Sequence, residues 1–175
     1  MRLLQKIIHP SLTNISGNVF ARKAVRAVVL DGEEILLLYT KRYNDFSFPG
    51  GGVSDEEDYA CALKRELIEE TGAQNIEILQ EYGYVDEYRP HYKTEFDLIH
   101  MLSFFYLCKV DKDLGLSKME HYEITNGMEA RWINIHEAIK HNRRVMESKE
   151  ASIGLSVERE TVVLEMVVRE LLHKV

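Results

Sequence analysis

Apolar and polar positions along this chain follow two different periods, and each period predicts a type of element. Lys23 to Leu30 and Glu34 to Lys41 are β-branched and aliphatic runs on either side of Asp31 and Gly32. An Asp-Gly pair between two apolar runs is typical of a tight hairpin turn, because glycine tolerates a positive φ. We therefore expect two adjacent antiparallel strands.

A short strand is expected next, in the segment KRYNDFSFPGGGV. Phe46 and Phe48 stand two positions apart there, just before Pro49 and three consecutive glycines. Glycines allow the chain to bend and leave a bare backbone that a ligand can approach. The pattern predicts a strand that leads into a close-fitting loop.

The rest of the chain alternates between strand-like and helix-like segments. We expect strands at Ile76 to Val85, Asp97 to Val110 and Ala130 to Ile135, and helices at His136 to His141 and Ser156 to His173, with a polar loop from Asp111 to Met128. The last helix has apolar residues at helical spacing and is expected to pack on the core. Strands alternating with helices around a mixed sheet indicate an α/β/α sandwich.

The stretch from Gly50 to Ala73 combines glycines, acidic residues and an amphipathic helix that Gly72 should end. Residues three and four positions apart share a helical face, so Glu66, Glu69 and Glu70 form one acidic edge. A separate apolar stripe is expected to anchor the helix. Its members are Ala60, Leu63, Leu67 and the methyl group of Thr71.

Glu57 precedes Glu66 by nine residues, which places it half a turn out of phase on a continuous helix. It can join the acidic edge only from a preceding loop, so the spacing predicts loop, helix, loop. The glycines are then a turn that brings Glu57 back. A second reading is a phosphate cradle, although the PGGGV loop lacks the Lys-Ser/Thr ending of a P-loop.

Carboxylates gathered on one edge repel each other unless a cation neutralises them. The ligands would be oxygen atoms alone, which points to Mg²⁺, with Mn²⁺ as the alternative. The simpler interpretation is a solvated acidic helix face, since runs of charge are usually surface.

These residues fit the pattern G-x5-E-x7-R-E-U-x-E-E-x-G-U, with U apolar, at every specified position from Gly51 to Ala73. The pattern resembles that of the Nudix hydrolase family. The resemblance implies the Nudix fold and metal-dependent hydrolysis of a nucleoside diphosphate linked to another moiety, with water attacking a phosphorus. Nucleoside triphosphates, nucleotide sugars, ADP-ribose and dinucleoside polyphosphates are all open as substrates.

The resemblance also implies residue roles. By analogy the metal ligands are the carbonyl of Gly50 and the carboxylates of Glu57, Glu66, Glu69 and Glu70. Glu66 or Glu69 would also act as the general base. Arg65, at i,i+4 from Glu69, is expected to orient a carboxylate. Such enzymes often add a carboxylate from a late loop, for which the candidates are Glu120, Glu123 and Glu129.

Two functional questions stay open at this point. Some domains of this kind bind nucleotide derivatives without turnover, but these usually lack part of the acidic set, which is intact here. The connection EYRPHYKTE and the strand before it carry aromatic and basic residues. These residues either contact substrate, by stacking a base and neutralising phosphate, or simply pack the strands.

Composition narrows the class of partner. A chain of 175 residues suits a single Nudix domain spanning 1–175, with residues 1–20 without an assigned role. That N-terminal segment could be an edge strand, a docking arm or a dimer element, so a homodimer is left open, but a segment simply packed against the core is the favoured interpretation. A net charge of -7 argues against a nucleic-acid polymer and for a small nucleotide held through a metal.

Cysteine usage and hydropathy indicate the compartment. Cys61 and Cys108 are far apart in sequence, and the seven histidines show no metal-ligand spacing. No apolar run reaches the length needed to cross a bilayer, and no signal peptide is evident. We expect a cytoplasmic protein without a membrane partner.

Overall fold

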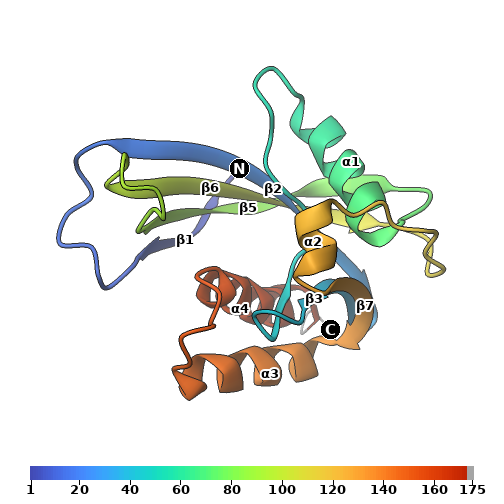
Figure 1. Ribbon diagram of the computed structural model, residues 1–175. Coiled ribbons are helices and arrows are strands. Elements are labelled where there is room, and N and C mark those ends of the chain that lie inside the picture. Colours follow the sequence, from blue (N-terminus) through green and yellow to red (C-terminus); the bar gives the residue numbers. More distant parts are fainter. Residues whose placement is uncertain (173–175) are drawn as a thin grey trace.

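The computed structural model describes residues 1–172, which form one mixed sheet of seven strands with helices on both faces (Figure 1). The strands are β1 (Leu3–Ile8), β2 (Val19–Asp31), β3 (Glu34–Thr40), β4 (Asp45–Ser47), β5 (Glu77–Arg89), β6 (Leu98–Lys109) and β7 (Met128–Asn134). The helices are α1 (Tyr59–Thr71), α2 (His121–Thr125), α3 (Ile135–Ser148) and α4 (Val157–Val167), which a π-helical turn, η1 (Val168–Leu172), continues. This confirms the expected α/β/α sandwich.

The sheet is mixed because two of its strand pairs are parallel and the others antiparallel. Its order is β1-β5-β6-β2-β3-β4, and β7 pairs with β3 as well. The β1–β5 and β2–β6 pairs run parallel. Parallel pairing of β2 with β6 brings together segments far apart in the chain, so the centre of the sheet depends on long-range contacts.

The helices bury two separate apolar faces of this sheet. Figure 1 shows α1 on one side and α3 and α4 on the other. On the α1 side, Leu63 and Leu67 are fully buried against strand residues such as Val25. Complete burial of one leucine side chain stabilises a fold by about 1.5–3 kcal/mol. On the opposite side, α3 and α4 pack over a core that includes Phe48 and Phe105.

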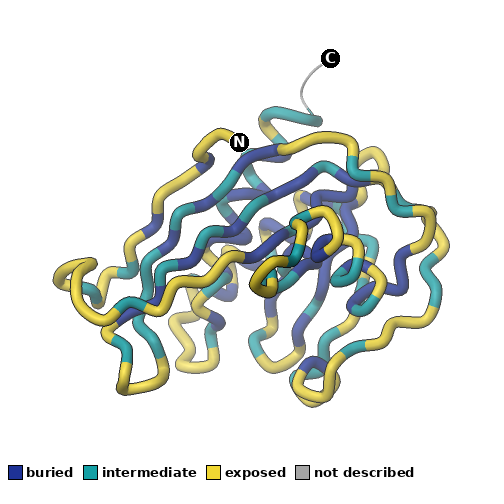
Figure 2. The backbone as a smooth tube through the Cα atoms, turned by 90° about the horizontal axis from the view of Figure 1, so that it is seen from above, coloured by how far each residue is buried: buried dark blue, intermediate teal, exposed yellow. Residues whose placement is uncertain are grey.

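Burial is greatest in the middle of the sheet, and Figure 2 shows the exposed backbone at the loops that connect the strands.

The N-terminal segment joins this arrangement as an edge strand, because β1 pairs with β5 and buries Leu4 and Ile7 in the core. Among residues 1–172, no helix is both long enough and apolar enough to span a membrane.

The predicted hairpin forms at Asp31 and Gly32, but β2 and β3 pair at only two positions beside the turn. The expectation of two adjacent antiparallel strands is therefore confirmed, although their pairing is short. From there the strands separate: β7 pairs with β3 over its whole length, and β4 pairs with its last three residues. The separation leaves room beside the middle of β2 for the segment that leads into α1.

Several predicted boundaries were wrong because tertiary contacts extend the elements. β5 continues through Arg89, so the start of the expected polar connection is strand, and α3 continues to Ser148. The polar loop contains α2, whose first turn is stabilised by a reciprocal capping box between Glu120 and Glu123. The expected C-terminal helix reached His173, which lies outside the described residues.

The predicted apolar stripe of α1 needs one correction. Leu63, Leu67 and Thr71 are buried, but Ala60 is exposed and Ala62 is buried instead. Ala60 is in the first turn of α1, where Tyr59 packs against Phe104 of β6 and Ala62 joins the buried cluster.

Candidate active site

Helix α1, which carries most of the acidic residues, has a capping residue at each end. Asp58 caps α1, since its Oδ1 accepts hydrogen bonds from the backbone N–H groups of Ala60 (3.0 Å) and Cys61 (3.2 Å). Gly72 ends it in the left-handed conformation, at φ 69°. Glu57 therefore lies before the helix, as its spacing predicted.

Arg65 gathers three of the acidic residues around one guanidinium group. Its Nε and Nη2 donate to the two carboxylate oxygens of Glu57, at 2.9 and 3.1 Å. Its Nη1 lies 2.7 Å from Glu66 Oε1 and 3.3 Å from Glu69 Oε2. The predicted contact with Glu69 is present, but it is the longest, and Arg65 itself is what brings Glu57 to the helix.

This clustering changes the electrostatics of the site. Hydrogen bonds from Arg65 hold the pKa of the Glu57 carboxyl below its usual value. Burial raises the pKa of Glu66, and the neighbouring Arg65 opposes that effect. One arginine therefore contacts all three carboxylates but offsets only part of their negative charge.

Glu70 is more deeply placed than the predicted acidic edge implies. Its side chain is buried, and its Oε2 accepts the backbone N–H of Gly50 at 2.6 Å. Desolvation raises the pKa of Glu70 well above the usual value, although Gly50 and Arg26 both favour the charged form. Glu70 thus ties α1 to the glycine-rich loop.

The glycine-rich loop is fixed to the sheet by its backbone. Val25 N–H donates to the Gly51 carbonyl at 2.9 Å, and Arg26 donates to the Gly50 carbonyl. Gly50 has φ 136°, and a Cβ at this position would clash with the backbone carbonyl oxygen of Val25. Only glycine allows this close approach, which supports the reading of the loop as a positioning turn.

A cavity of about 620 Å³ lies where these elements meet. Its acidic and carbonyl-bearing wall is formed by Gly50, Glu66, Glu69 and Glu70, with Glu120 and Glu123 from the α2 segment. Glu57 lines an adjoining cavity of about 640 Å³. Of the three late candidates, Glu129 alone is absent from the cavity wall, and it pairs with Arg131 on β7.

Sequence reasoning missed the cations of this cavity. Arg22 and Arg26 from β2 and Arg159 from α4 line it together with Arg65. A signal was available in the run KAVRAVVL, where Arg26 interrupts an otherwise apolar strand. Nothing local could have shown that Arg159, distant in sequence, faces the same space.

The donor set fits a hard divalent cation, because the sequence-predicted ligands offer oxygen atoms alone and four of the five line one cavity. Within residues 1–172, no three acidic, histidine or cysteine side chains are arranged as a ready-made ion-binding group. Arg65 lies among three of these carboxylates, those of Glu57, Glu66 and Glu69.

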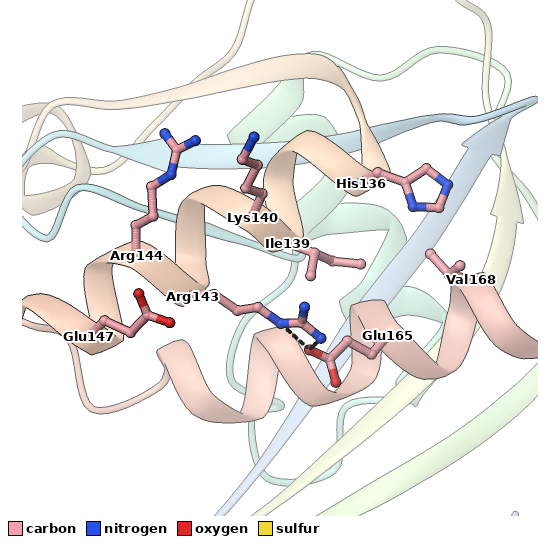
Figure 3. A pocket seen from close by; sticks show the side chains of 8 residues that line it. All are labelled: His136, Ile139, Lys140, Arg143, Arg144, Glu147, Glu165 and Val168. Atoms are coloured by element: carbon pink, nitrogen blue, oxygen red, sulfur yellow. Dashed lines mark hydrogen bonds and ion pairs between the residues drawn. The ribbon is translucent and has the colours of Figure 1, made fainter.

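A separate hollow of about 550 Å³ lies between α3 and α4 (Figure 3). Arg143 crosses it to pair with Glu165 at 2.6 Å, and Lys140 and Arg144 also line it. None of the sequence-predicted site residues contributes to this hollow. It is a basic surface feature distinct from the acidic cavity.

The chain is similar in sequence to proteins of one known family. The profile of the NUDIX domain matches residues 21–152. An RNA pyrophosphohydrolase of Bartonella henselae is 42% identical over 45 residues, which are 26% of this chain and 26% of that protein. The chain thus spans about a quarter of the length of this curated relative in the match.

Solved structures show the same fold. A NUDIX hydrolase from Nitrosomonas europaea superposes with a TM-score of 0.56 at 18% identity, over 85% of this chain and 90% of that chain. The E. coli ORF135 protein superposes with a TM-score of 0.51 at 19% identity, over 89% and 95% of the two chains.

Proposed function

Because the chain belongs to the Nudix hydrolase family, we propose that it is a divalent-metal-dependent pyrophosphohydrolase. Its substrate would be a nucleoside diphosphate linked to another moiety, and the bond cleaved would be one of the diphosphate. The family fixes this chemical class and leaves the second moiety open.

One observation carries the proposal. Acidic groups from α1 and two arginines from β2, Arg22 and Arg26, line a single cavity at the end of the glycine-rich loop. A diphosphate would use both, since the carboxylates would hold a divalent cation that offsets its charge and the arginines would bind further phosphate oxygens. A solvated acidic helix face would not require arginines on the adjoining strand.

The position of each residue at the acidic cavity suggests its role in the reaction. Bound Mg²⁺ would supply Lewis-acid polarisation of the phosphoryl oxygens and a lowered pKa for the attacking water. Glu57, Glu66, Glu69 and Glu70, with the carbonyl of Gly50, would hold the ion. Glu70 is the most rigidly held of these, because it is buried and bonded to the loop.

The proton of the attacking water would pass to Glu66 or Glu69. Both carboxylates line the cavity, so either one can lie within reach of a water molecule bound there. Arg65 would orient these carboxylates, and Arg22 and Arg26 would bind phosphate oxygens. Each role uses an atom that already faces or borders the cavity.

A panel of nucleotide substrates tests this function. Nucleoside triphosphates, nucleotide sugars, ADP-ribose, dinucleoside polyphosphates and a 5′-triphosphorylated oligoribonucleotide would each be incubated with Mg²⁺ or Mn²⁺ and with a chelator. The oligoribonucleotide is included because the Bartonella relative is an RNA pyrophosphohydrolase. We expect metal-dependent release of nucleotide or phosphate from at least one member and none with the chelator.

A matched pair of variants assigns that turnover to the cavity. Glu69→Gln should lower kcat by about 100-fold or more, because an anionic ligand is lost. Its melting temperature without metal should be unchanged or higher. Glu129→Gln is the control, since Glu129 is absent from the cavity wall. Full activity in Glu69→Gln would contradict the proposal, and tight nucleotide binding with no turnover in the wild type would instead assign a regulatory binding domain.

A further inference from the structure

A further cavity, of about 470 Å³, adjoins the acidic cavity that Glu66, Glu69 and Glu70 line, and it is called the second cavity below. Arg22, Tyr43 and Ser156 line both cavities, so the two share a wall. A molecule whose diphosphate occupies the acidic cavity would extend its attached group into this neighbour. The side chains there therefore indicate what that group is.

Aromatic rings form one wall of the second cavity. Phe20 at the start of β2 meets His91 edge-on, with ring centroids 5.0 Å apart. Tyr92 stacks on His91 at 4.7 Å with only 19° between the planes. Tyr92 is 85% exposed, so it contributes little to packing of the strands. Its ring instead extends an existing stack, to which another flat ring can be added.

Cations with free hydrogen-bonding capacity form another part of the wall. Within residues 1–172, neither Arg22 nor Arg89 has a side-chain hydrogen bond, and the nearest carboxylate to Arg89 is Glu87, at 4.0 Å. Glu87 is already engaged by Arg159 at 2.5 Å. The Arg89 side chain is only 19% exposed, so its donors are largely withdrawn from water.

A half-buried guanidinium group is stabilised when an acceptor enters and takes its hydrogen bonds. Arginine binds phosphate oxygens with two parallel hydrogen bonds, which a sugar hydroxyl does not match. Lys93 adds a further positive charge to the same cavity. Stacking surface and phosphate-binding cations together match a nucleotide and do not match an uncharged sugar.

On the basis of the proposed hydrolase function, we propose that this second cavity is the nucleoside subsite of the enzyme. The base stacks on Tyr92, and Arg89 and Arg22 bind oxygens of the ribose phosphate that leads into the acidic cavity. Substrates that carry a base are then preferred to diphosphates without one. This assigns to Tyr92 and Arg89 a role that determines specificity.

Binding of nucleoside diphosphates without divalent metal tests the subsite independently of turnover. ADP and UDP would be compared with inorganic pyrophosphate by calorimetry, so that the probes differ only in the nucleoside. The wild type should bind the nucleoside diphosphates at least 10-fold more tightly than pyrophosphate. Tyr92→Ala should raise the Kd for ADP about 10-fold and leave that for pyrophosphate unchanged.

Conservative and distant variants make the test specific. Tyr92→Phe should retain the affinity for ADP, because the stacking face is kept. Leu79→Ala is the control, since Leu79 is exposed on β5 and lines neither cavity. Arg89→Met should weaken binding of both ADP and pyrophosphate, because both carry the phosphate oxygens that Arg89 binds, while Tyr92→Ala should raise KM for the best substrate and leave kcat nearly unchanged.

The outcomes separate the two proposals. An unchanged Kd for ADP in Tyr92→Ala, or an equal loss for ADP and pyrophosphate, would overturn the subsite even if turnover is normal. Selective loss of ADP binding in a protein that hydrolyses none of the panel would support the subsite and refute the hydrolase function.

Discussion

Two arginine-centred clusters in this molecule use the same residue types in different surroundings. Arg65 holds glutamates at the edge of the acidic cavity, and its side chain is 36% exposed. Arg159 holds Glu87 at 2.5 Å and Glu160 at 2.6 Å beneath α4, and its side chain is 2% exposed. One cluster borders water, and the other is enclosed by protein.

Because of this difference in burial, the ion pairs of Arg65 can be replaced by other partners (the exchangeable cluster), whereas those of Arg159 cannot (the permanent cluster). Exposed ion pairs contribute little to stability, so the glutamates at Arg65 can exchange partners at small cost. A buried pair cannot lose one member without leaving an uncompensated charge inside the protein. Glu160 also accepts the backbone N–H of Phe48 at 2.9 Å, so the Arg159 cluster joins α4 to the sheet. We infer that the first cluster serves binding and the second serves folding.

Removal of the central arginine from each cluster should give the largest contrast. Arg159→Met leaves Glu87 and Glu160 buried without their partner and should destabilise the fold by about 3–5 kcal/mol. For a chain of this size that lowers the melting temperature by roughly 10 °C. Arg65→Met should change the free energy of unfolding by at most about 1 kcal/mol. Denaturant unfolding of both variants without metal measures the difference, and equal losses would remove the distinction between the clusters.

Asp45, which is buried near Glu160 of the Arg159 cluster, should make the stability of the fold depend on pH. Burial and the nearby charge of Glu160 raise the pKa of Asp45 from 3.8 to about 6. Because the folded state binds this proton more tightly, stability is higher below about pH 4 and is lost as the pH rises through 6. Asp45→Asn cannot ionise and should be more stable than the wild type at pH 8, by of the order of 2 kcal/mol.

The advantage of Asp45→Asn should shrink towards pH 4.5, which urea unfolding at the two pH values would reveal. Asp113→Asn, at an exposed carboxyl, is the matched control and should show no such trend. A constant difference between Asp45→Asn and the wild type across this range would show that ionisation of Asp45 does not limit stability.

The parts of the site that the sequence predicted are those set by local geometry. Helical spacing placed Leu63 and Leu67 against the core, and it excluded Glu57 from the helix. Both results follow from the fixed rotation per residue, which tertiary contacts do not alter. The capping by Gly72 depended on local chemistry in the same way.

The parts that escaped prediction depend on which segments meet. Arg26 and Arg159 face one cavity only because β2 lies at the centre of the sheet and α4 crosses beneath it. Burial of Glu70 likewise depends on the path of the glycine-rich loop. Spacing showed that Glu70 shares an edge with Glu66, but not that the loop would cover it. The sequence left open whether the aromatic residues near Tyr92 contact substrate, because it did not show that β6 brings the end of β5 close to the start of β2.

Added Mg²⁺ should stabilise the folded protein through the Arg65 cluster, by less than the loss expected from Arg159→Met. An ion that binds the folded state alone stabilises it by about 1.4 kcal/mol at ten times its Kd, which corresponds to a few degrees in melting temperature. The increment should be larger in Arg65→Met, because its unpaired carboxylates repel one another until the ion enters. In the wild type Arg65 already offsets part of this repulsion through Glu66 and Glu69, and this reduces the gain from the ion. Thermal unfolding across a Mg²⁺ titration gives both increments, with Glu129→Gln expected to match the wild type. A smaller increment in Arg65→Met than in the wild type would mean that Arg65 helps to hold the ion, and the cluster would then be a fixed part of the metal site.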